Sequence, residues 1–255
     1  MNEVLSAIIW GVVQGITEFL PVSSDGHLVL VPAFLGIEGP DLATTAFLHL
    51  GTLAAVIIYF RHELWGLTRI RRDPAARKLA GLLVLGTLPA FAALLVEDEV
   101  AALQASVTAT AWFMILTSAV LFVGTMLRNR YRSIDDAGPV DAVLVGTAQV
   151  FAVLPGLSRS AVTITTGLGR HFRQVDAARF SFLLGIPAVA GAGLLETARL
   201  LGGEGITSAD WVGVVVAGVT GYLAIGFLLR QLGRGGLLPY AIYCLIVGSA
   251  ALILL

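Results

Sequence analysis

Runs of apolar residues long enough to cross a lipid bilayer constrain the fold of this chain more than any other feature. A helix needs about 20 residues to cross roughly 30 Å of hydrocarbon. Six runs reach or approach that length: 42–60, 79–96, 106–127, 178–200, 211–229 and 237–255. Only 13% of the residues are charged, against about 25% in a soluble domain. The sequence therefore predicts an all-α integral membrane protein with six transmembrane helices.

Four shorter hydrophobic stretches are joined in pairs by proline-containing breaks. The first pair, 4–20 and 23–35, is broken at Pro21, and the second pair, 140–154 and 160–168, at another proline. Proline cannot continue a helix interior, and irregular backbone cannot face lipid. Each pair therefore predicts a re-entrant helical hairpin whose tip is buried in protein or lines a wet cavity.

Basic residues gather in alternate connectors, which predicts the orientation because cytoplasmic loops carry an excess of Lys and Arg. The connector 61–78 holds six basic residues. Further basic positions are Arg128, Arg130, Arg132, Arg170, Arg173, Arg179, Arg230 and Arg234. The other connectors are acidic or nearly neutral, as at 97–99 and Glu204. With six spans, both termini are expected outside a plasma (inner) cell membrane.

The chain is expected to form a single membrane domain, 1–255, built from internal repeats of about 1–130 and 136–255. Identities at a shift of 134 or 135 residues include Gly11 with Gly146, Gln14 with Gln149, Leu20-Pro21 with Leu154-Pro155 and Ser24 with Ser158. Three spans per half would place the halves in opposite orientations, as in inverted-repeat folds that bind substrates near the bilayer midplane. The two hairpins should then enter from opposite sides and meet at their tips.

Both hairpin tips carry polar and ionisable residues where the flanking sequence predicts lipid. A charged side chain at membrane depth costs roughly 2.5–3.5 kcal/mol on insertion scales, so such residues are candidates for a functional site. The first tip supplies Gln14, Glu18, Ser23, Ser24, Asp25, Gly26 and His27, and the second supplies Gly156, Ser158, Arg159, Ser160 and Thr163.

These residue types suit phosphate chemistry. Backbone amides at a helix N-terminus favour an anion, and Arg159 adds a planar donor fork. Glu18 lies one helical turn after Gln14, so both can face a divalent cation, which offsets the repulsion between a carboxylate and a phosphate. His27 could act as general acid or base, and Ser24 as a nucleophile that His27 activates.

Structural explanations compete with each of these roles. Glu18 could be a neutralised or paired carboxyl, Arg159 its ion-pair partner, and Asp25 a charge at a helix N-terminus. The serines of both tips could be helix caps. His49, in the middle of the run 42–60, could either pack or line the cavity.

The two tips resemble the motifs of the undecaprenyl-diphosphate phosphatase family of the bacitracin-resistance type. Residues 14–27 are similar to the family's Glu/Gln-Gly-x-x-Glu-Phe-Leu-Pro-Val-Ser-Ser-x-Gly-His, and residues 155–163 to its Pro-Gly-x-Ser-Arg-Ser-x-x-Thr. Residues 177–187 also resemble a family signature, and the similarity covers essentially the whole chain.

The resemblance implies six transmembrane helices with two re-entrant helical pairs, often as a homodimer. The implied activity converts a C55-type polyprenyl diphosphate into the monophosphate lipid carrier and inorganic phosphate, with a divalent cation (Mg²⁺ or Ca²⁺). Membrane lipid is the expected surrounding, and no nucleic-acid partner is expected.

Carried over residue by residue, the resemblance makes Glu18, His27 and Arg159 essential, Gln14 an aid at the metal and Ser24 a disputed nucleophile. The chain departs from the pattern twice. Gln14 stands where many members have Glu, and Asp25 stands where Thr is common. We expect Asp25 to replace the missing carboxylate, so that the metal site would comprise Gln14, Glu18 and Asp25.

A transporter is the main competing function. An inverted repeat could alternately expose a lipid-phosphate or small-anion site, as a flippase or carrier does, and a membrane scaffold is a third alternative. A carrier needs phosphate recognition but neither a nucleophile nor proton transfer. The clustering of Glu18, Ser24 and His27 therefore favours catalysis.

Overall fold

The computed structural model describes residues 2–96, 100, 103–104, 106–127, 131–200 and 207–255. These residues are almost entirely helical, and the β-type pairing found among them is one isolated bridge between Arg132 and Phe172. The elements are α1 (Glu3–Phe19), α2 (Ser24–Leu35), α3 (Leu42–Tyr59), α4 (Arg61–Leu67), α5 (Pro74–Thr87), η1 (Leu88–Val96), α7 (Val107–Met126), η2 (Ile134–Asp136), α8 (Pro139–Val150), η3 (Phe151–Val153), α9 (Arg159–Gly169), α10 (Gln174–Leu200), α11 (Ser208–Leu232) and α12 (Leu238–Leu254).

Each apolar stretch predicted from the sequence forms a helix. The six long runs correspond to α3, α5 with η1, α7, α10, α11 and α12, and the four shorter ones to α1, α2, α8 and α9. Two details were not predicted. The short helix α4 bends 75° away from α3, and the second run ends in the 3₁₀-helix η1. That change comes one residue before Pro89, which lacks the N–H that a continuing α-helix would use.

Side-chain caps explain where several helices begin. Asn2, Asp41 and Ser106 each accept a hydrogen bond from a backbone N–H two or three residues further on, at the starts of α1, α3 and α7. Thr207 and Asp210 form a reciprocal capping box at the start of α11. Such caps satisfy amides that have no partner within the helix, so short polar residues between apolar runs mark the helix boundaries.

Three described helical segments are long and apolar enough to cross a membrane: Pro74–Ala92, Val107–Met126 and Ser208–Leu232. The bent pair α3–α4 adds a fourth if it counts as one crossing. The chain is thus a helical protein with several apolar helices suited to a membrane. Of the residues used to predict its orientation, Arg128, Arg130, Glu204 and the acidic residues 97–99 lie outside the described part of the chain.

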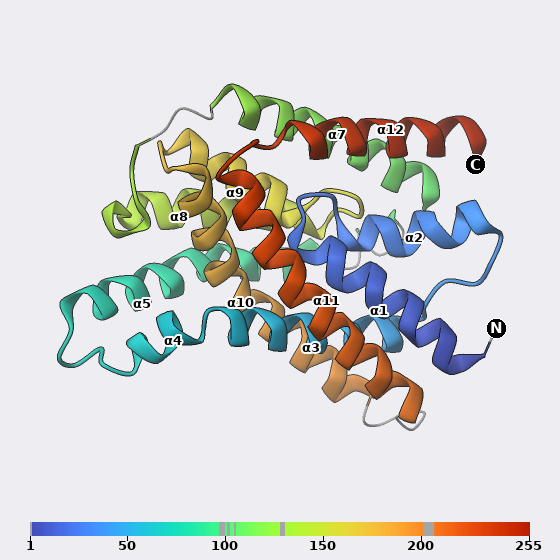
Figure 1. Cartoon of the computed structure of the whole chain (residues 1–255), viewed down its shortest axis with the longest axis horizontal. Helices are drawn as coiled ribbons and strands as arrows, with labels where there is room; N and C mark the ends of the chain where they lie inside the picture. Colours follow the sequence, from blue (N-terminus) through green and yellow to red (C-terminus); the bar gives the residue numbers. More distant parts are fainter. Residues whose placement is uncertain (1, 97–99, 101–102, 105, 128–130, 201–206) are drawn as a thin grey trace.

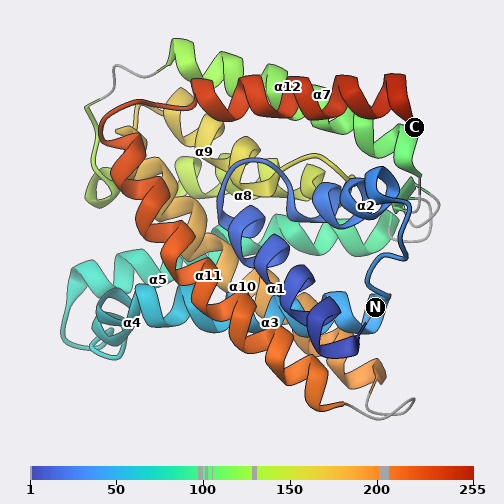
Figure 2. The same ribbon diagram turned by 45° about the vertical axis from the view of Figure 1, so that its right-hand side comes forward.

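The two short helix pairs point toward each other. The hairpin α1–α2 has its outer ends on the side of the molecule where both termini lie, and α8 and α9 come from the opposite side (Figure 1). α3, α7 and α11 run away from the side of the termini, and α5, α10 and α12 run back toward it (Figure 1). α12 lies along α7 in both views, and α1 packs against α11 (Figure 2).

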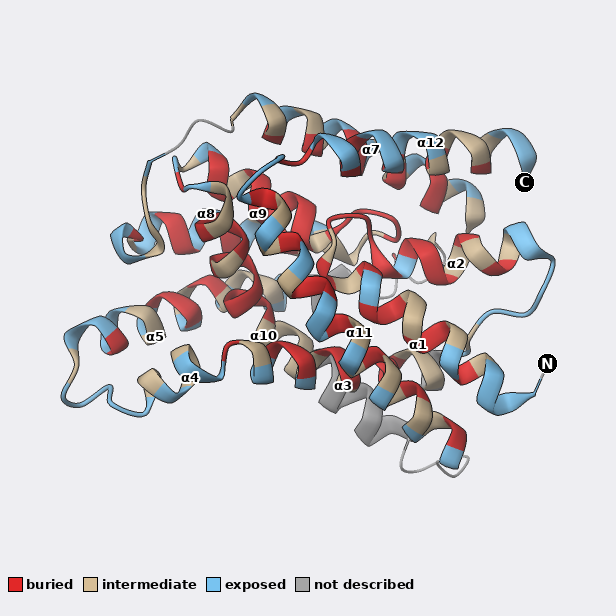
Figure 3. Cartoon of the chain, in the orientation of Figure 1, coloured by how far each residue is buried: buried red, intermediate tan, exposed pale blue. Residues whose placement is uncertain are grey.

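Glycines let the first helix of each hairpin approach its neighbour closely. A Cβ on Gly15 would collide with Thr220 of α11, and a Cβ on Gly146 would collide with the backbone of Gly86 in α5. Small residues allow helices in membranes to pack backbone to backbone. Buried residues accordingly concentrate around the hairpin tips and α9, whereas outward faces of α5, α7 and α12 are exposed (Figure 3).

Candidate active site

The first tip is a tight turn between α1 and α2. Ser23 adopts a left-handed conformation with φ 69°, and its Oγ accepts a hydrogen bond from the Gly26 N–H at 3.2 Å. The Nδ1 of His27 lies 2.6 Å from the Ser23 carbonyl oxygen and therefore acts as the donor. The strained residue thus both caps α2 and is held through its own carbonyl group.

The second tip is built on a glycine. Gly156 has φ 90°, and a Cβ there would collide with the Thr110 carbonyl oxygen of α7. The Thr117 hydroxyl donates to the Gly156 carbonyl at 2.8 Å and accepts from the Ser158 N–H at 3.0 Å. Ser158 then caps α9 by accepting from the Ala161 N–H at 3.2 Å. Arg159 is therefore the first residue of a firmly held helix.

An ion pair joins the two tips. The Nη2 of Arg159 lies 2.9 Å from Oε1 of Glu18, and the two side chains are only 17% and 7% exposed. Gly185 of α10 makes room for this pair, because a Cβ there would collide with the guanidinium. The sequence-based expectation that Glu18 and Arg159 converge is confirmed. A purely structural ion pair would show the same contact, so the catalytic role is argued from the surrounding residues and the cavity.

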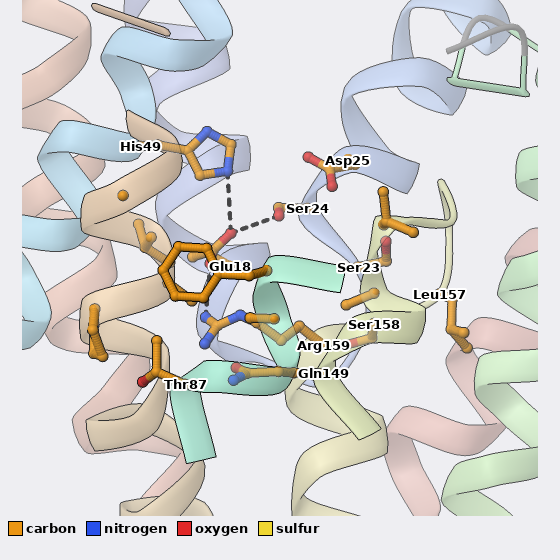
Figure 4. Close-up of a pocket in the computed structure, with 18 residues that line it drawn as sticks. Glu18, Ser23, Ser24, Asp25, His49, Thr87, Gln149, Leu157, Ser158 and Arg159 are labelled. Atoms are coloured by element: carbon orange, nitrogen blue, oxygen red, sulfur yellow. Dashed lines mark hydrogen bonds and ion pairs between the residues drawn. The ribbon is translucent and has the colours of Figure 1, made fainter. Parts of the chain in front are cut away.

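Glu18 is the centre of a polar network. Its Oε2 accepts hydrogen bonds from the Ser24 hydroxyl at 2.7 Å and from Nε2 of Gln14 at 3.2 Å. The Nε2 of His49 lies 3.7 Å from the same oxygen (Figure 4). The Nδ1 of His49 donates to the Thr45 carbonyl at 2.9 Å. The carboxylate therefore organises side chains from α1, α2, α3 and α9.

This network faces a cavity of about 500 Å³, a size common for small-molecule sites. Its polar lining is Glu18, Ser23, Ser24, Asp25, His49, Thr87, Gln149, Ser158 and Arg159. Its apolar lining is Ala90, Phe91, Ala152, Val153, Leu157, Pro187, Ala188 and Val189. A molecule with an anionic head and a hydrocarbon tail matches this division.

His27 lies apart from the cavity, which corrects the predicted pairing with Ser24. Its Nδ1 donates to Ser23, and its Nε2 lies 2.6 Å from the hydroxyl of Tyr243 in α12. Ser24 instead donates to Glu18. Within the described residues, the group placed to take a proton from Ser24 is therefore the carboxylate and not the imidazole.

The other predicted substrate-binding residues divide into two groups. Ser23 and Ser158 line the cavity. Ser160 contacts the Ser158 hydroxyl at 3.1 Å, and the Thr163 hydroxyl lies 2.6 Å from that of Ser181. Ser160 and Thr163 therefore stabilise the tips, as Gly26 and Gly156 do, and do not line the cavity.

Of the polar residues that line the cavity, His49, Thr87 and Gln149 were not predicted as site residues. His49, which the sequence left undecided, lines the cavity. Gln149 of α8 also lines it, with Nε2 donating to the Gly86 carbonyl at 3.1 Å and Oε1 buried without a partner among the described residues. Its match to Gln14 in the internal repeat is the sequence signal that could have identified it.

The predicted metal ligands fit in chemistry but do not form a ready-made site. Among the described residues, no three His, Cys, Asp or Glu side chains are grouped closely enough to hold a metal ion. However, Oε1 of Gln14 is buried without a described partner beside Glu18, and Asp25 lines the same cavity. Amide and carboxylate oxygens are the ligands that Mg²⁺ and Ca²⁺ prefer.

These features define a class: helical proteins with apolar helices suited to a membrane and a partly polar, partly apolar cavity between two hairpin tips. Residues 7–250 match the family model described as "Bacitracin resistance protein BacA". This chain belongs to that family, as its motifs suggested.

Curated relatives share the whole length of the chain. It is 40% identical to "Undecaprenyl-diphosphatase 2" of Stutzerimonas stutzeri (strain A1501), over 99% of this chain and 98% of the relative. It is also 40% identical to "Undecaprenyl-diphosphatase" of Alcanivorax borkumensis, over 96% and 97%. A protein of the same name from Methanosphaera stadtmanae is 36% identical, over 100% and 99%.

Proposed function

We propose that this protein is an undecaprenyl-diphosphatase, which converts the polyprenyl diphosphate into the monophosphate lipid carrier and inorganic phosphate. The observation that carries the proposal is the buried Glu18–Arg159 pair on the polar wall of a half-apolar cavity. The names of the full-length relatives agree with it. A flippase or anion carrier is not favoured, because a carrier has no use for a hydroxyl that donates to a buried carboxylate.

Arg159 binds the diphosphate in this proposal. One nitrogen of its guanidinium is engaged by Glu18, and the planar fork has further N–H donors for phosphate oxygens. Donors fixed in advance where charge develops stabilise a transition state more than donors that must reorganise. The ion pair therefore serves to hold the guanidinium in place before the substrate arrives.

Glu18 accepts the proton of the nucleophile. In the serine route, the Ser24 oxygen attacks the terminal phosphorus and its proton passes to Glu18. The bond from that phosphorus to the bridging oxygen breaks, so the polyprenyl monophosphate leaves and water later hydrolyses the phosphoserine. In the water route, a water molecule attacks directly and Glu18 takes its proton. His27 then acts as a positioning residue that holds the turn beside Ser24.

A divalent cation would complete the charge balance. Glu18 and Asp25 together carry more charge than Arg159 offsets, so a diphosphate would add further negative charge without compensation. Gln14, Glu18 and Asp25 would hold the cation, which would neutralise charge on the phosphates and the leaving group.

The membrane arrangement belongs to the same proposal. Six helices cross the bilayer, two re-entrant hairpins enter from opposite sides, and the halves form an inverted repeat with both termini outside. The alternating helix directions and the opposed hairpins support it (Figure 1). The homodimer that the family resemblance implies stays a prediction.

The test is phosphate release from a C55 polyprenyl diphosphate by the purified protein in detergent, with and without a chelator. We expect cation-dependent release that Glu18→Ala and Arg159→Ala nearly abolish. Arg230→Ala is the matched control, because Arg230 is exposed and hydrogen-bonded to Gly226 of its own helix. Normal release by both cavity variants, each still folded, would refute the proposed site.

A further inference from the structure

A second cavity, of about 380 Å³, lies between α4, α5, η1 and α10. Its lining consists of Leu64, Leu67, Ala80, Leu83, Val84, Thr87, Leu88, Phe91, Leu183, Ile186 and Pro187. Thr87 supplies the polar side chain of this set, and its hydroxyl donates to the Leu83 carbonyl at 2.7 Å. The described lining therefore offers hydrocarbon and no free hydrogen-bonding side chain. We call this cavity the apolar groove.

The apolar groove is continuous with the 500 Å³ cavity that Glu18 and Arg159 line, which we call the charged cavity. Thr87, Phe91 and Pro187 line both, and Figure 4 places Thr87 beside Gln149 at the edge of the charged cavity. On its outer side the groove is open, because Val84, Leu88 and Phe91 are 65%, 56% and 61% exposed. One molecule could therefore reach from the polar network through the groove into surrounding lipid.

We propose that the apolar groove binds the first isoprene units of the substrate's tail while the diphosphate lies at Arg159. This inference rests on the proposed function. Continuity with the charged cavity favours the tail over a bilayer lipid, since only a molecule with its head beside Arg159 gains from both sites. Burial of hydrocarbon against hydrocarbon drives the binding.

The length of the groove limits how much of the tail it holds. Along α10 it runs from Pro187 to Leu183, and one turn further Arg179 pairs with Glu63 of α4 at 2.8 Å. The eight residue steps from 179 to 187 span about 12 Å of helix. The groove therefore recognises the start of an isoprenoid chain, and the remainder lies in the bilayer.

Ala80→Phe tests the proposal by filling the groove from its α5 wall, where Ala80 is half-buried. We expect the KM for the C55 diphosphate to rise about tenfold with little change in kcat, as for the loss of apolar pocket contacts. The KM for a five-carbon isoprenyl diphosphate should rise less, because only one isoprene unit of that substrate can lie in the groove. Ala119→Phe is the matched control, since Ala119 is exposed on α7 and lines neither cavity.

The outcomes separate failure of the groove from failure of the function. An unchanged KM in Ala80→Phe, with normal phosphate release, would show that bulk lipid fills the groove and would overturn this inference alone. No release from either substrate by the wild type would overturn the function. Photo-crosslinking of wild-type protein with a C55 diphosphate carrying a diazirine in its first isoprene unit avoids folding effects. We expect labelling between residues 80 and 91, and labelling of α7 or α12 instead would overturn the groove.

Discussion

The two hairpin tips share a plan and differ in charge. Each tip is bonded to a long helix from the other half of the chain: His27 of the first contacts Tyr243 of α12, and Gly156 of the second accepts from Thr117 of α7. The first tip then presents Glu18, whereas the second presents Arg159. Two similar uncharged turns that meet would form only a packing contact, whereas the opposite charges of Glu18 and Arg159 form the ion pair on which the proposed diphosphate site depends.

The hairpins also differ at their outer ends. Asp141, 2% exposed at the start of α8, accepts from Arg132 Nη2 and Arg170 Nε, both at 2.7 Å. Its hydrogen bond raises the pKa of Arg132, which also lies 4.8 Å over the Phe172 ring. The described outer ends of α1 and α2 have no such ion pair. The hairpin that carries Arg159 is thus fixed at both ends, and the acidic hairpin mainly at its tip.

The difference in charge between the two tips predicts the largest effect of a mutation, at Arg159. We expect Arg159→Lys to lower kcat for phosphate release by about 10²–10³, because an ammonium cannot engage Glu18 and a phosphate in one planar fork. Arg230→Lys, at an exposed site, should leave release unchanged. Activity of Arg159→Lys within a few-fold of wild type would mean that charge alone suffices and that the fork is unimportant.

The turns at the two tips should respond differently to substitution of the residue that has a positive φ. Gly156→Ala forces a Cβ against the Thr110 carbonyl at a positive φ, so we expect a loss of about 3 kcal/mol in unfolding free energy. Denaturant unfolding in mixed micelles measures it. Gly169→Ala is the control, because nothing lies within 4 Å of its added Cβ. Equal stability of the two variants would contradict the tight packing of the second tip.

The ion pairs of Asp141 at the outer end of the second hairpin can be removed by mutation. We expect Asp141→Asn to lower the unfolding free energy by about 2 kcal/mol, less than for a fully buried pair because both arginines reach solvent. Asp73→Asn, at the partly exposed N-cap of α5, should change little. If both variants have the same unfolding free energy, the difference between the outer ends of the two hairpins has no energetic consequence.

The acidic tip should respond to cation concentration. Asp25→Asn should raise the Mg²⁺ concentration for half-maximal phosphate release about tenfold, since it removes a carboxylate ligand. Asp41→Asn, the exposed N-cap of α3, serves as control. Coincident titration curves for wild type and Asp25→Asn would eliminate Asp25 as the replacement for the missing glutamate at position 14.

The sequence predicted the helices because apolar run length and proline breaks are local signals. It predicted the meeting of Glu18 with Arg159 from the internal repeat of the two hairpins. It did not predict the other contacts between residues that are distant in the chain. Tyr243 lies 216 residues after His27 and takes the imidazole nitrogen that the pattern had assigned to Ser24. His49 resembled any buried histidine of an apolar helix. The bend at α4 and the 3₁₀ segment η1, which shape the apolar groove, were not predicted either, although Pro89 is a local signal for the start of η1.

The smallest expected effect concerns the strain at Ser23. A non-glycine residue at φ 69° costs about 1–2 kcal/mol, while replacing a serine N-cap by glycine costs only a few tenths. Ser23→Gly should therefore raise the unfolding free energy by about 1 kcal/mol, opposite in sign to Gly156→Ala. If this variant is more stable but releases phosphate more slowly, the strained turn serves to hold Ser24 against Glu18. If rate and stability rise together, the positive φ at Ser23 has no role in catalysis, and the two tips differ in charge alone.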